Sequence, residues 1–310
     1  MNPTLRVLLS SSLAISTYFD PLHRKDSNNS KRRHLQPMAS PKGTILLTGA
    51  NGGLGCGTVS KIISTPELAQ YHGVYIVRDS SVAAALKSTL KKAPTSHSYE
   101  ILSLELSLLA NVRDFVRGFS TRAAERDIPP VRALILNAGY NDLRQQSLTH
   151  EGFDTSFVAN YLGHWLLTMM LLQTMDRENG RIVVLGSNSY DVNHPVHKLN
   201  GHYEDEKWKT FFRDENIDTI AKGTWSSNKD DLPRRAGVRR YGVAKIKSSA
   251  DVLRAAFETS PELRGKYLNG SEPQEVVPEA ADIQKRAMVW RDSVKYAQLT
   301  EQDTTLVNWT

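Results

Sequence analysis

The chain has a single cysteine, Cys56, among its 310 residues, and it contains no run of about 18 apolar residues. A lone cysteine excludes an internal disulfide, so the fold requires no oxidising compartment. The absence of a long apolar run leads us to expect no stable membrane span. A composition of 40% hydrophobic and 23% charged residues excludes a disordered chain and favours a large globular core.

The net positive charge of the chain is concentrated in its N-terminal segment. Residues 1–41 carry +4 of the total net charge of +6, so we expect no nucleic-acid partner for the remainder. The segment predicts a disordered basic extension, although its Arg and Ser content also fits a mitochondrial presequence. Residues 42–310 predict a single folded domain. We expect a cytoplasmic protein, with a mitochondrial or membrane-associated location as alternatives.

Apolar β-branched runs alternate with amphipathic stretches of helical length from residue 43 onward. The predicted strands are Thr44–Thr48, Val74–Val77, Tyr99–Leu104, Ala133–Asn137 and Ile182–Leu185. The predicted helices lie around residues 54–65, 81–92, 108–126 and 152–175. This alternation predicts an α/β fold: a Rossmann-like, doubly wound parallel sheet with helices on both faces.

The predicted helix over 152–175 is apolar around much of its circumference. Its apolar residues are Phe153, Phe157, Val158, Tyr161, Leu162, Trp165, Leu166, Met169 and Met170. Such a helix is buried on more than one side. Core packing accounts for part of this surface, and a homo-oligomer interface is our expectation for the rest.

A glycine-rich segment follows the first predicted strand and precedes the first predicted helix. It reads Gly49-Ala50-Asn51-Gly52-Gly53-Leu54-Gly55. Glycine permits positive φ and close approach of the backbone to a pyrophosphate, and a helix start offers free N–H groups to an anion. The segment therefore predicts a dinucleotide-binding turn, with a plain tight turn as the alternative.

The end of the second predicted strand bears on the choice of cofactor. It reads Val77-Arg78-Asp79. An arginine in the deciding place binds the 2′-phosphate of NADP, whereas an aspartate binds the ribose hydroxyl of NAD. Because Arg78 follows the apolar run directly, the sequence favours NADP over NAD.

Tyr241 and Lys245 are four residues apart, so on a helix they share one face. A nearby ammonium lowers the pKa of a phenol from about 10, which makes tyrosine a usable proton donor and acceptor. Taken alone, this spacing also fits an ordinary solvated helix face.

Four motifs occur together in a fixed order. They are Thr48-Gly49-x-x-x-Gly53-x-Gly55, Asn137-Ala138-Gly139 after the fourth strand, a serine after the fifth, and Tyr241-x-x-x-Lys245. This order resembles the short-chain dehydrogenase/reductase family, and in particular fungal members related to retinol dehydrogenases and protochlorophyllide reductases. The resemblance runs from about Gly43 to Lys245. It implies hydride transfer between a nicotinamide and a carbonyl or secondary alcohol of a small-molecule substrate.

The resemblance also implies roles for catalytic residues. Tyr241 would be the general acid/base, and Lys245 would lower its pKa and bind the nicotinamide ribose. Ser187 would hydrogen-bond the substrate oxygen, with Ser189 as the alternative. Asn160 would hold a water in the proton relay.

Further residues are assigned to the cofactor. By resemblance, Asn137 braces the sheet beside it, and Glu105 stands near the adenine where the family usually has an aspartate. The complete expected set is Gly49, Asn51, Gly53, Leu54, Gly55, Arg78, Glu105, Asn137, Gly139, Tyr241 and Lys245.

An insertion at about residues 189–238 separates the serine from Tyr241. Its Trp and Phe residues predict a wall over the site and a lipophilic substrate. Its histidines, His194, His197 and His202, are metal-ligand types, but their spacing fits no common zinc site and no cysteine is near. We therefore expect no metal.

The sequence departs from the family after Lys245. A helical pattern follows directly, over residues 241–258, where the family has a sixth strand and a Pro-Gly loop. The segment Gly265–Gly270 resembles the last strand, so the sequence predicts six parallel strands instead of seven. The leading hypothesis is an NADP-dependent oxidoreductase. A cofactor-binding but catalytically idle protein, or a truncated non-functional one, is the alternative.

Overall fold

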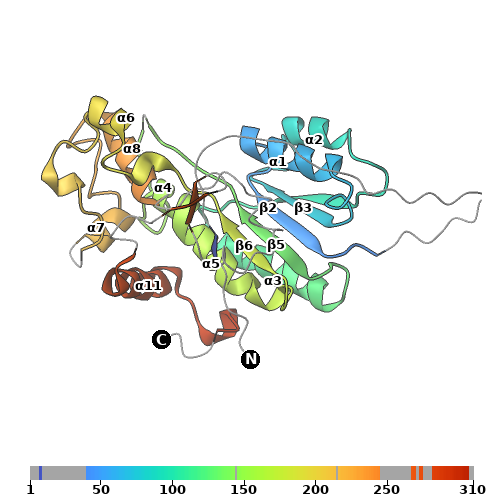
Figure 1. The fold of residues 1–310 in the computed structure, drawn as a ribbon. Coiled ribbons are helices and arrows are strands. Elements are labelled where there is room, and N and C mark those ends of the chain that lie inside the picture. The colour runs from blue at the N-terminus through green and yellow to red at the C-terminus, as the bar shows by residue number, and fades with distance from the viewer. Residues whose placement is uncertain are drawn as a thin grey trace, which may run out of the picture.

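The computed structural model describes residues 7–8, 40–143, 145–213, 216–244, 267–269, 272–274 and 281–306. Its main sheet has the strand order β1-β6-β5-β2-β3-β4, and every neighbouring pair is parallel (Figure 1). The strands are β1 (Val7–Leu8), β2 (Thr44–Thr48), β3 (His72–Val77), β4 (Tyr99–Ser103), β5 (Val131–Leu136) and β6 (Arg181–Val184). The predicted Rossmann-like α/β fold is confirmed.

Helices cover both faces of this sheet. Alternate strand residues point to opposite faces, so neighbours such as Ile45 and Leu46 belong to different cores. Ile45 packs with the core that includes helices α1 (Gly53–Ser64) and α2 (Ala84–Leu90). Leu46 packs with the core that includes α3 (Leu109–Ala124) and α5 (Gly163–Leu171). The continuous apolar runs of the strands follow from this coverage of both faces.

The sixth strand of the sheet differs from the predicted one. Beside β6 lies β1, with Val7 opposite Ile182 and Leu8 opposite Val183. The segment predicted as the last parallel strand instead forms β7 (Tyr267–Asn269), which pairs antiparallel with β8 (Glu272–Gln274) in a separate sheet. The prediction that Gly265–Gly270 joins the parallel sheet is therefore wrong.

The predicted helix over 152–175 consists of four short pieces. They are α4 (Thr155–Phe157), the π-helix η1 (Val158–Leu162), α5 and the 3₁₀-helix η2 (Leu172–Thr174). The Asp154 side chain caps the first turn by accepting from the Phe157 N–H. Single π-turns within a helix occur frequently at functional sites.

Helix α11 (Ile283–Ala297) packs against η1 and α5 (Figure 1). The Trp165 and Trp290 rings meet edge to face with centroids 5.4 Å apart, and Tyr161 Oη lies 2.7 Å from Ser293 Oγ. The chain itself therefore covers part of the apolar face that suggested an oligomer interface.

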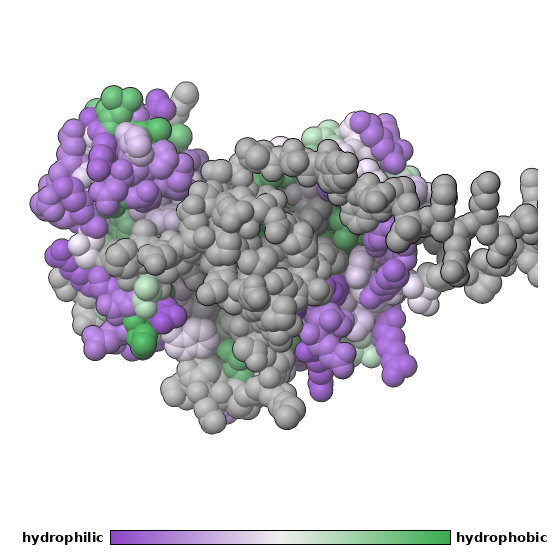
Figure 2. All heavy atoms as spheres, viewed as in Figure 1, coloured by the Kyte–Doolittle hydropathy of each residue, from purple (hydrophilic) through white to green (hydrophobic). Residues whose placement is uncertain are grey.

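The insertion contains η3 (Asn188–Tyr190), α6 (Pro195–Leu199), η4 (Glu206–Trp208) and α7 (Ile217–Ala221), and it leads into α8 (Pro233–Ala244). Trp208, Phe211 and Trp225 are buried, and the Trp225 ring contacts each of the other two edge to face. The surface around it is mostly hydrophilic, with an apolar patch over α6 (Figure 2), where Leu199 is 87% exposed. In the described part of the chain, no helix is both long and apolar enough to cross a membrane.

Candidate functional site

Several predicted site residues follow the carboxyl ends of the parallel strands, and these ends share one edge of the sheet. Gly49, Arg78 and Asn137 directly follow β2, β3 and β5, and Ser187 comes three residues after β6. In doubly wound folds, ligands bind outside this edge.

The glycine turn has the conformation that a phosphate cradle requires. Gly49 has φ +67°, and a Cβ there would lie 2.7 Å from the Ala138 Cα. At Gly55 a Cβ would lie 2.8 Å from Ala50 Cα and collide with the Gly49 carbonyl oxygen. Gly53, by contrast, starts α1, is exposed, and has nothing within 4 Å of its Cβ position. The turn is thus closed on the protein side and open over the helix N-terminus, which fits a pyrophosphate.

Asn51 and Leu54 are the two non-glycine residues of the turn that were assigned to the cofactor. The Asn51 Oδ1 accepts a hydrogen bond from the Leu86 N–H at 2.9 Å, which holds the start of α2 beside the turn. Leu54 is 46% exposed, so its side chain is accessible to a bound cofactor. Asn51 therefore braces the turn, a role that the sequence did not indicate.

Two predicted cofactor residues form an ion pair with each other. Arg78 Nε lies 3.1 Å from Glu105 Oε2, and the Arg78 side chain is 67% exposed. Its guanidinium lies 5.9 Å from the centroid of the Tyr140 ring. Asp79, the alternative cofactor residue, accepts from the Ser81 N–H and hydroxyl, which lowers the pKa of its carboxyl.

Asn137 links the ends of β2 and β5. Its Nδ2 donates to the backbone oxygens of Thr48 at 2.8 Å and Gly49 at 3.1 Å. Thr48 Oγ1 in turn accepts from the N–H groups of Asn137 and Ala138. Gly139, the last residue of the motif, lies at the same edge. The expected bracing role of Asn137 thus has a geometric basis.

Asn160 sits in the π-helix η1 with all of its amide atoms engaged. Its Oδ1 accepts from the Tyr140 N–H, and its Nδ2 donates to the carbonyl oxygens of Tyr140 and Ser156. The backbone oxygen of Asn160 lies 3.3 Å from His164 Nδ1, and His164 Nε2 lies 3.0 Å from Thr48 Oγ1. His164 therefore joins Asn160 to the cofactor turn. We missed it from the sequence, where its spacing of four from Asn160 was the available signal.

Ser187 and Ser189 form a hydroxyl pair. Their Oγ atoms lie 2.9 Å apart, and Ser187 Oγ also accepts from the Ser189 N–H at 3.2 Å. When Ser189 donates to Ser187, the Ser187 proton is available to a third group. The geometry therefore allows Ser187 to donate to a substrate oxygen.

Tyr241 lies on α8, which packs against both η3 and η1. Helix α8 approaches η3 closely at Gly242, because a Cβ there would collide with the Ser189 carbonyl oxygen and lie 2.7 Å from Tyr203 Oη. Burial raises the pKa of the Tyr241 phenol. Lys245, the expected source of an opposing effect, lies outside the described residues, as does most of the predicted helix over 241–258.

The histidines of the insertion support the turn that contains Ser187 and Ser189, which we call the serine turn. Among the described residues, no group of three or more His, Cys, Asp or Glu side chains has a metal-binding arrangement. His197 Nδ1 lies 2.7 Å from His202 Nδ1, and His197 Nε2 lies 3.2 Å from the Asn188 carbonyl oxygen. Burial lowers the pKa of both imidazoles, that of His202 to about 4. Two neutral rings explain this contact, since one must donate and the other accept.

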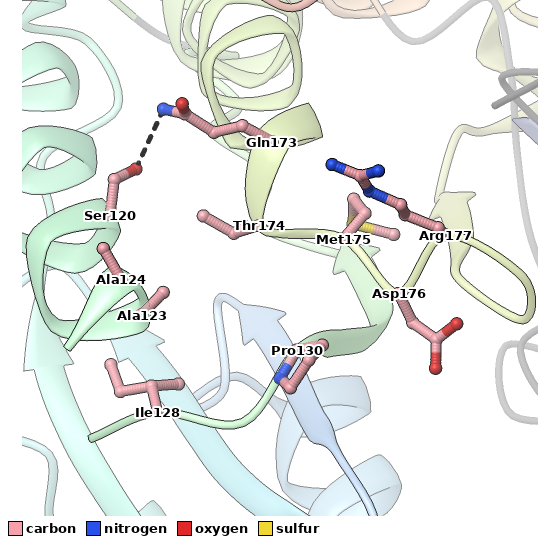
Figure 3. Close-up of a pocket in the computed structure, with 10 residues that line it drawn as sticks. All are labelled: Ser120, Ala123, Ala124, Ile128, Pro130, Gln173, Thr174, Met175, Asp176 and Arg177. Carbon is pink, nitrogen blue, oxygen red and sulfur yellow. Dashed lines mark hydrogen bonds between the residues drawn. The ribbon is translucent and has the colours of Figure 1, made fainter. Parts of the chain in front are cut away.

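A separate hollow lies at the opposite edge of the sheet (Figure 3). It has a volume of about 470 Å³ and is lined by the end of α3, the approach to β5, and residues from η2 to just before β6. Gln173 Nε2 donates to Ser120 Oγ across it at 3.3 Å. None of the predicted site residues lines it, so it is separate from the candidate site.

Comparison with known proteins gives consistent matches. The profile of the short chain dehydrogenase family matches residues 43–198. The short-chain dehydrogenase iccH of Talaromyces variabilis is 34% identical over 363 aligned positions, which cover 86% of this chain and 99% of that protein. Because this alignment is longer than the 310-residue chain, the relative has internal segments with no counterpart here.

More distant matches cover smaller shares. The chloroplastic protochlorophyllide reductase of Daucus carota is 30% identical over 157 residues, 49% of this chain and 37% of that protein. The chain thus matches well under half the length of that enzyme. A solved metagenomic short-chain oxidoreductase in complex with NADP is 19% identical, with a TM-score of 0.36, over 48% of this chain and 62% of that one.

Proposed function

Since the chain belongs to the short-chain dehydrogenase family, we propose that it transfers a hydride between NADP(H) and a carbonyl or secondary alcohol. One observation carries this proposal. Helix α8, which bears Tyr241, packs against both η3, next to Ser187, and η1, which contains Asn160. This packing supports the proposal, because it sets the helix that bears the proposed proton donor beside the segments that bear the proposed hydroxyl donor and relay residue.

The protein's own residues would handle the proton. Burial raises the pKa of Tyr241, which keeps the phenol protonated and ready to donate to a carbonyl oxygen at neutral pH. Ser187 would donate a hydrogen bond to the same oxygen and stabilise the charge that develops there. A bound nicotinamide would supply or accept the hydride. Lys245, four residues from Tyr241, would lower the phenol pKa for the reverse reaction.

We propose NADP as the preferred cofactor because of Arg78. Its Nε forms the ion pair with Glu105, and the exposed guanidinium leaves further N–H groups accessible to a phosphate. The Asp79 carboxylate already accepts two hydrogen bonds from Ser81. Both bonds are to Oδ1, so Oδ2 remains accessible to a ribose hydroxyl, and the preference for NADP rests on Arg78.

The structure removes one reason for expecting a lipophilic substrate. The candidates for an apolar wall were Trp208, Phe211, Phe212 and Trp225. The exposed fractions of Trp208, Phe211 and Trp225 are 6%, 2% and 8%, and Phe212 is partly buried against the same core. These residues form the core of the insertion instead of facing a site. Our proposal for the substrate is therefore a small carbonyl compound or alcohol, with no preference for apolar ones.

Two measurements test the proposed function. The first is the melting temperature of the full chain with excess NADPH or NADH, because a ligand that binds the native state raises the midpoint. The second is NADPH oxidation with phenanthrenequinone as the carbonyl probe. We expect a larger shift with NADPH than with NADH, and turnover that Tyr241→Phe abolishes while leaving the NADPH shift intact. Turnover that persists in Tyr241→Phe would refute the assigned proton donor.

A catalytically idle protein is the second candidate, and the alignment with iccH supports it. That relative carries internal segments that this chain lacks, and a missing internal segment can remove part of a substrate site. An NADPH-dependent shift in melting temperature, without turnover of any carbonyl probe, would favour this candidate.

We also propose a cytoplasmic location and retain a homo-oligomer through the 152–175 region as part of the proposal. Helix α11 occupies part of that face, at Tyr161 and Trp165. A partner would therefore have to use the remaining surface or displace α11.

A further inference from the structure

Two adjacent arginines on α8, Arg239 and Arg240, are almost completely buried, with exposed fractions of 0% and 3%. Arginine is rarely buried unless it is paired, so each must be held by specific groups. Arg240 immediately precedes Tyr241. Its Nη2 lies 3.1 Å from Asp142 Oδ1, and its Nε lies 3.3 Å from Asp154 Oδ2.

The two carboxylates connect Arg240 to the rest of the site. Asp142 lies three residues after Gly139, in the segment that leaves β5. Asp154 caps the turn that continues into η1 and Asn160. A third segment, from the insertion, is bound through the Ser226 carbonyl oxygen, which accepts from Arg240 Nη1 at 2.6 Å. One guanidinium therefore joins three segments to the helix of the proposed proton donor.

The charges in this cluster do not balance. Asp142 and Asp154 are both buried, and among the described residues a single guanidinium contacts them. Asp142 Oδ2 has no hydrogen-bond partner among the described residues. Burial raises the pKa of both carboxyls, and repulsion from Asp142 contributes to a pKa of about 6 for Asp154. The cluster therefore takes up a proton at a higher pH than an isolated carboxyl would.

The other groups around the cluster supply no second cation to balance it within the described part of the chain. Gln146 donates to Asp154 Oδ2, Ser156 donates to Asp142 Oδ1, and Asn228 Oδ1 accepts from Arg240 Nη1. Arg239 turns away from the two carboxylates. It donates to Asp231, to the Ser226 hydroxyl and to the His202 carbonyl oxygen, all within the insertion.

We propose that Arg240 is a positioning residue for proton transfer by Tyr241. Through Asp142 and Asp154 it fixes the Tyr241 helix relative to the segment that leads from the cofactor edge to Asn160. The proposal rests on the proposed function of Tyr241. Close packing at the same place supports it, because a Cβ at Gly237, one turn before Arg240, would lie 2.9 Å from the Asp142 carbonyl oxygen.

Arg240→Lys tests the positioning, and Arg239→Lys is the matched control. Lysine keeps the charge but loses the planar fork that reaches two carboxylates and a carbonyl group. The two arginines are adjacent and similarly buried, but the hydrogen bonds of Arg239 go to the insertion. With NADPH and phenanthrenequinone, Arg240→Lys should lower kcat roughly 10- to 100-fold, with an unchanged KM for NADPH. Arg239→Lys should change kcat by less than about threefold while lowering the melting temperature comparably. Equal losses of kcat would overturn the proposal.

A second readout does not depend on turnover. The ionisation of Tyr241 is measured from tyrosinate absorbance, as the difference between each protein and its Tyr241→Phe counterpart. Arg240→Lys should shift this titration, and Arg239→Lys should not. If the wild-type protein reduces no carbonyl probe but the titration shifts, the proposed function fails and the positioning stands. An unshifted titration in Arg240→Lys overturns the positioning.

Asp142→Asn tests the charge imbalance if Arg240→Lys does not fold. The amide that this substitution introduces can still accept from Arg240 and Ser156, and its NH₂ replaces the oxygen without a partner. Removing one negative charge should let Asp154 stay ionised to lower pH. The melting temperature of Asp142→Asn, relative to wild type, should therefore increase between pH 5 and pH 7. A difference that is flat across this range would contradict the proton uptake by the cluster and overturn the proposal.

Discussion

Gly242→Ala should move helix α8, which bears Tyr241, away from the serine turn. A Cβ at this position would lie 2.7 Å from Tyr203 Oη and collide with the Ser189 carbonyl oxygen, whereas ordinary contact begins at 3.4 Å. Neither neighbour moves freely. Tyr203 is 4% exposed, and its hydroxyl donates a hydrogen bond to the Ser189 carbonyl oxygen at 2.6 Å. The two atoms that block the Cβ therefore hold each other in place.

The size of the effect follows from the displacement required. To restore ordinary contact with Tyr203 alone, α8 and the serine turn must separate by roughly 0.7 Å, and the Ser189 contact demands more. A misplacement of about 1 Å between reacting groups costs about 100-fold in rate, or about 2.7 kcal/mol of transition-state stabilisation. We therefore expect kcat to fall about 100-fold, with the NADPH-induced shift in melting temperature preserved, because α8 packs mainly against η3, α4 and η1 rather than against the helix that follows the glycine turn.

The assay is steady-state NADPH oxidation with phenanthrenequinone, run alongside thermal melts. Gly118→Ala is the matched control, because this exposed glycine of α3 has nothing within 4 Å of its Cβ position. Alanine there should stabilise the helix by about 0.5 to 1 kcal/mol and leave kcat unchanged. If Gly242→Ala keeps wild-type kcat, the close approach of α8 to Ser189 has no catalytic role and the reasoning is refuted.

Three further predictions concern the cofactor, acid stability and the C-terminal helix. Arg78→Ala should weaken NADPH binding roughly 10- to 100-fold and NADH binding little, as measured by titration calorimetry; equal losses would contradict the 2′-phosphate role. The His202 pKa is lowered from 6.5 to about 4 in the folded protein, so its contribution to stability is present above pH 6.5 and is lost as the pH falls toward 4. Chemical denaturation of His202→Asn, whose amide can still donate to His197, should show a smaller loss of stability between pH 7 and pH 5 than wild type. Deleting residues 282–310 should uncover Tyr161 and Trp165, lower the melting temperature and promote self-association in light scattering. An unchanged particle size would show that α11 does not protect this face.

Strands β2, β3, β5 and β6 could be predicted because they are mostly buried on both faces, whereas the edge strand β4 is only partly buried. A continuous apolar run such as Ala133–Leu136 predicts a strand in the interior of the sheet. The short pairings could not be predicted in the same way. Strand β1 has two residues and β7 has three, and at that length tertiary contacts decide whether and where a segment pairs.

The site could be predicted as far as its motifs extended, and no further. Glycine and asparagine positions carry a local conformational meaning, so Gly49, Gly55 and Asn137 had visible roles. Gly242 looked like an ordinary helix residue, because the atoms that require it belong to Ser189 and Tyr203, far from it in the chain. The π-turn at Asn160 was equally hidden, since the apolar pattern continues through it.

The insertion supports the site through backbone contacts with its neighbours. Tyr203 donates to the Ser189 carbonyl oxygen, and Arg239 binds the His202 carbonyl oxygen, so the insertion holds both the serine turn and α8. Its aromatic residues pack around this connection, with Arg239 lying 4.3 Å from the centroid of the Trp208 ring. These Trp, Phe and His residues suggested a substrate wall and drew attention to metal chemistry. In the structure they have a packing role instead. They connect α8 and the serine turn to the insertion, so a substitution in that core, like Arg239→Lys, should lower the melting temperature while changing kcat little.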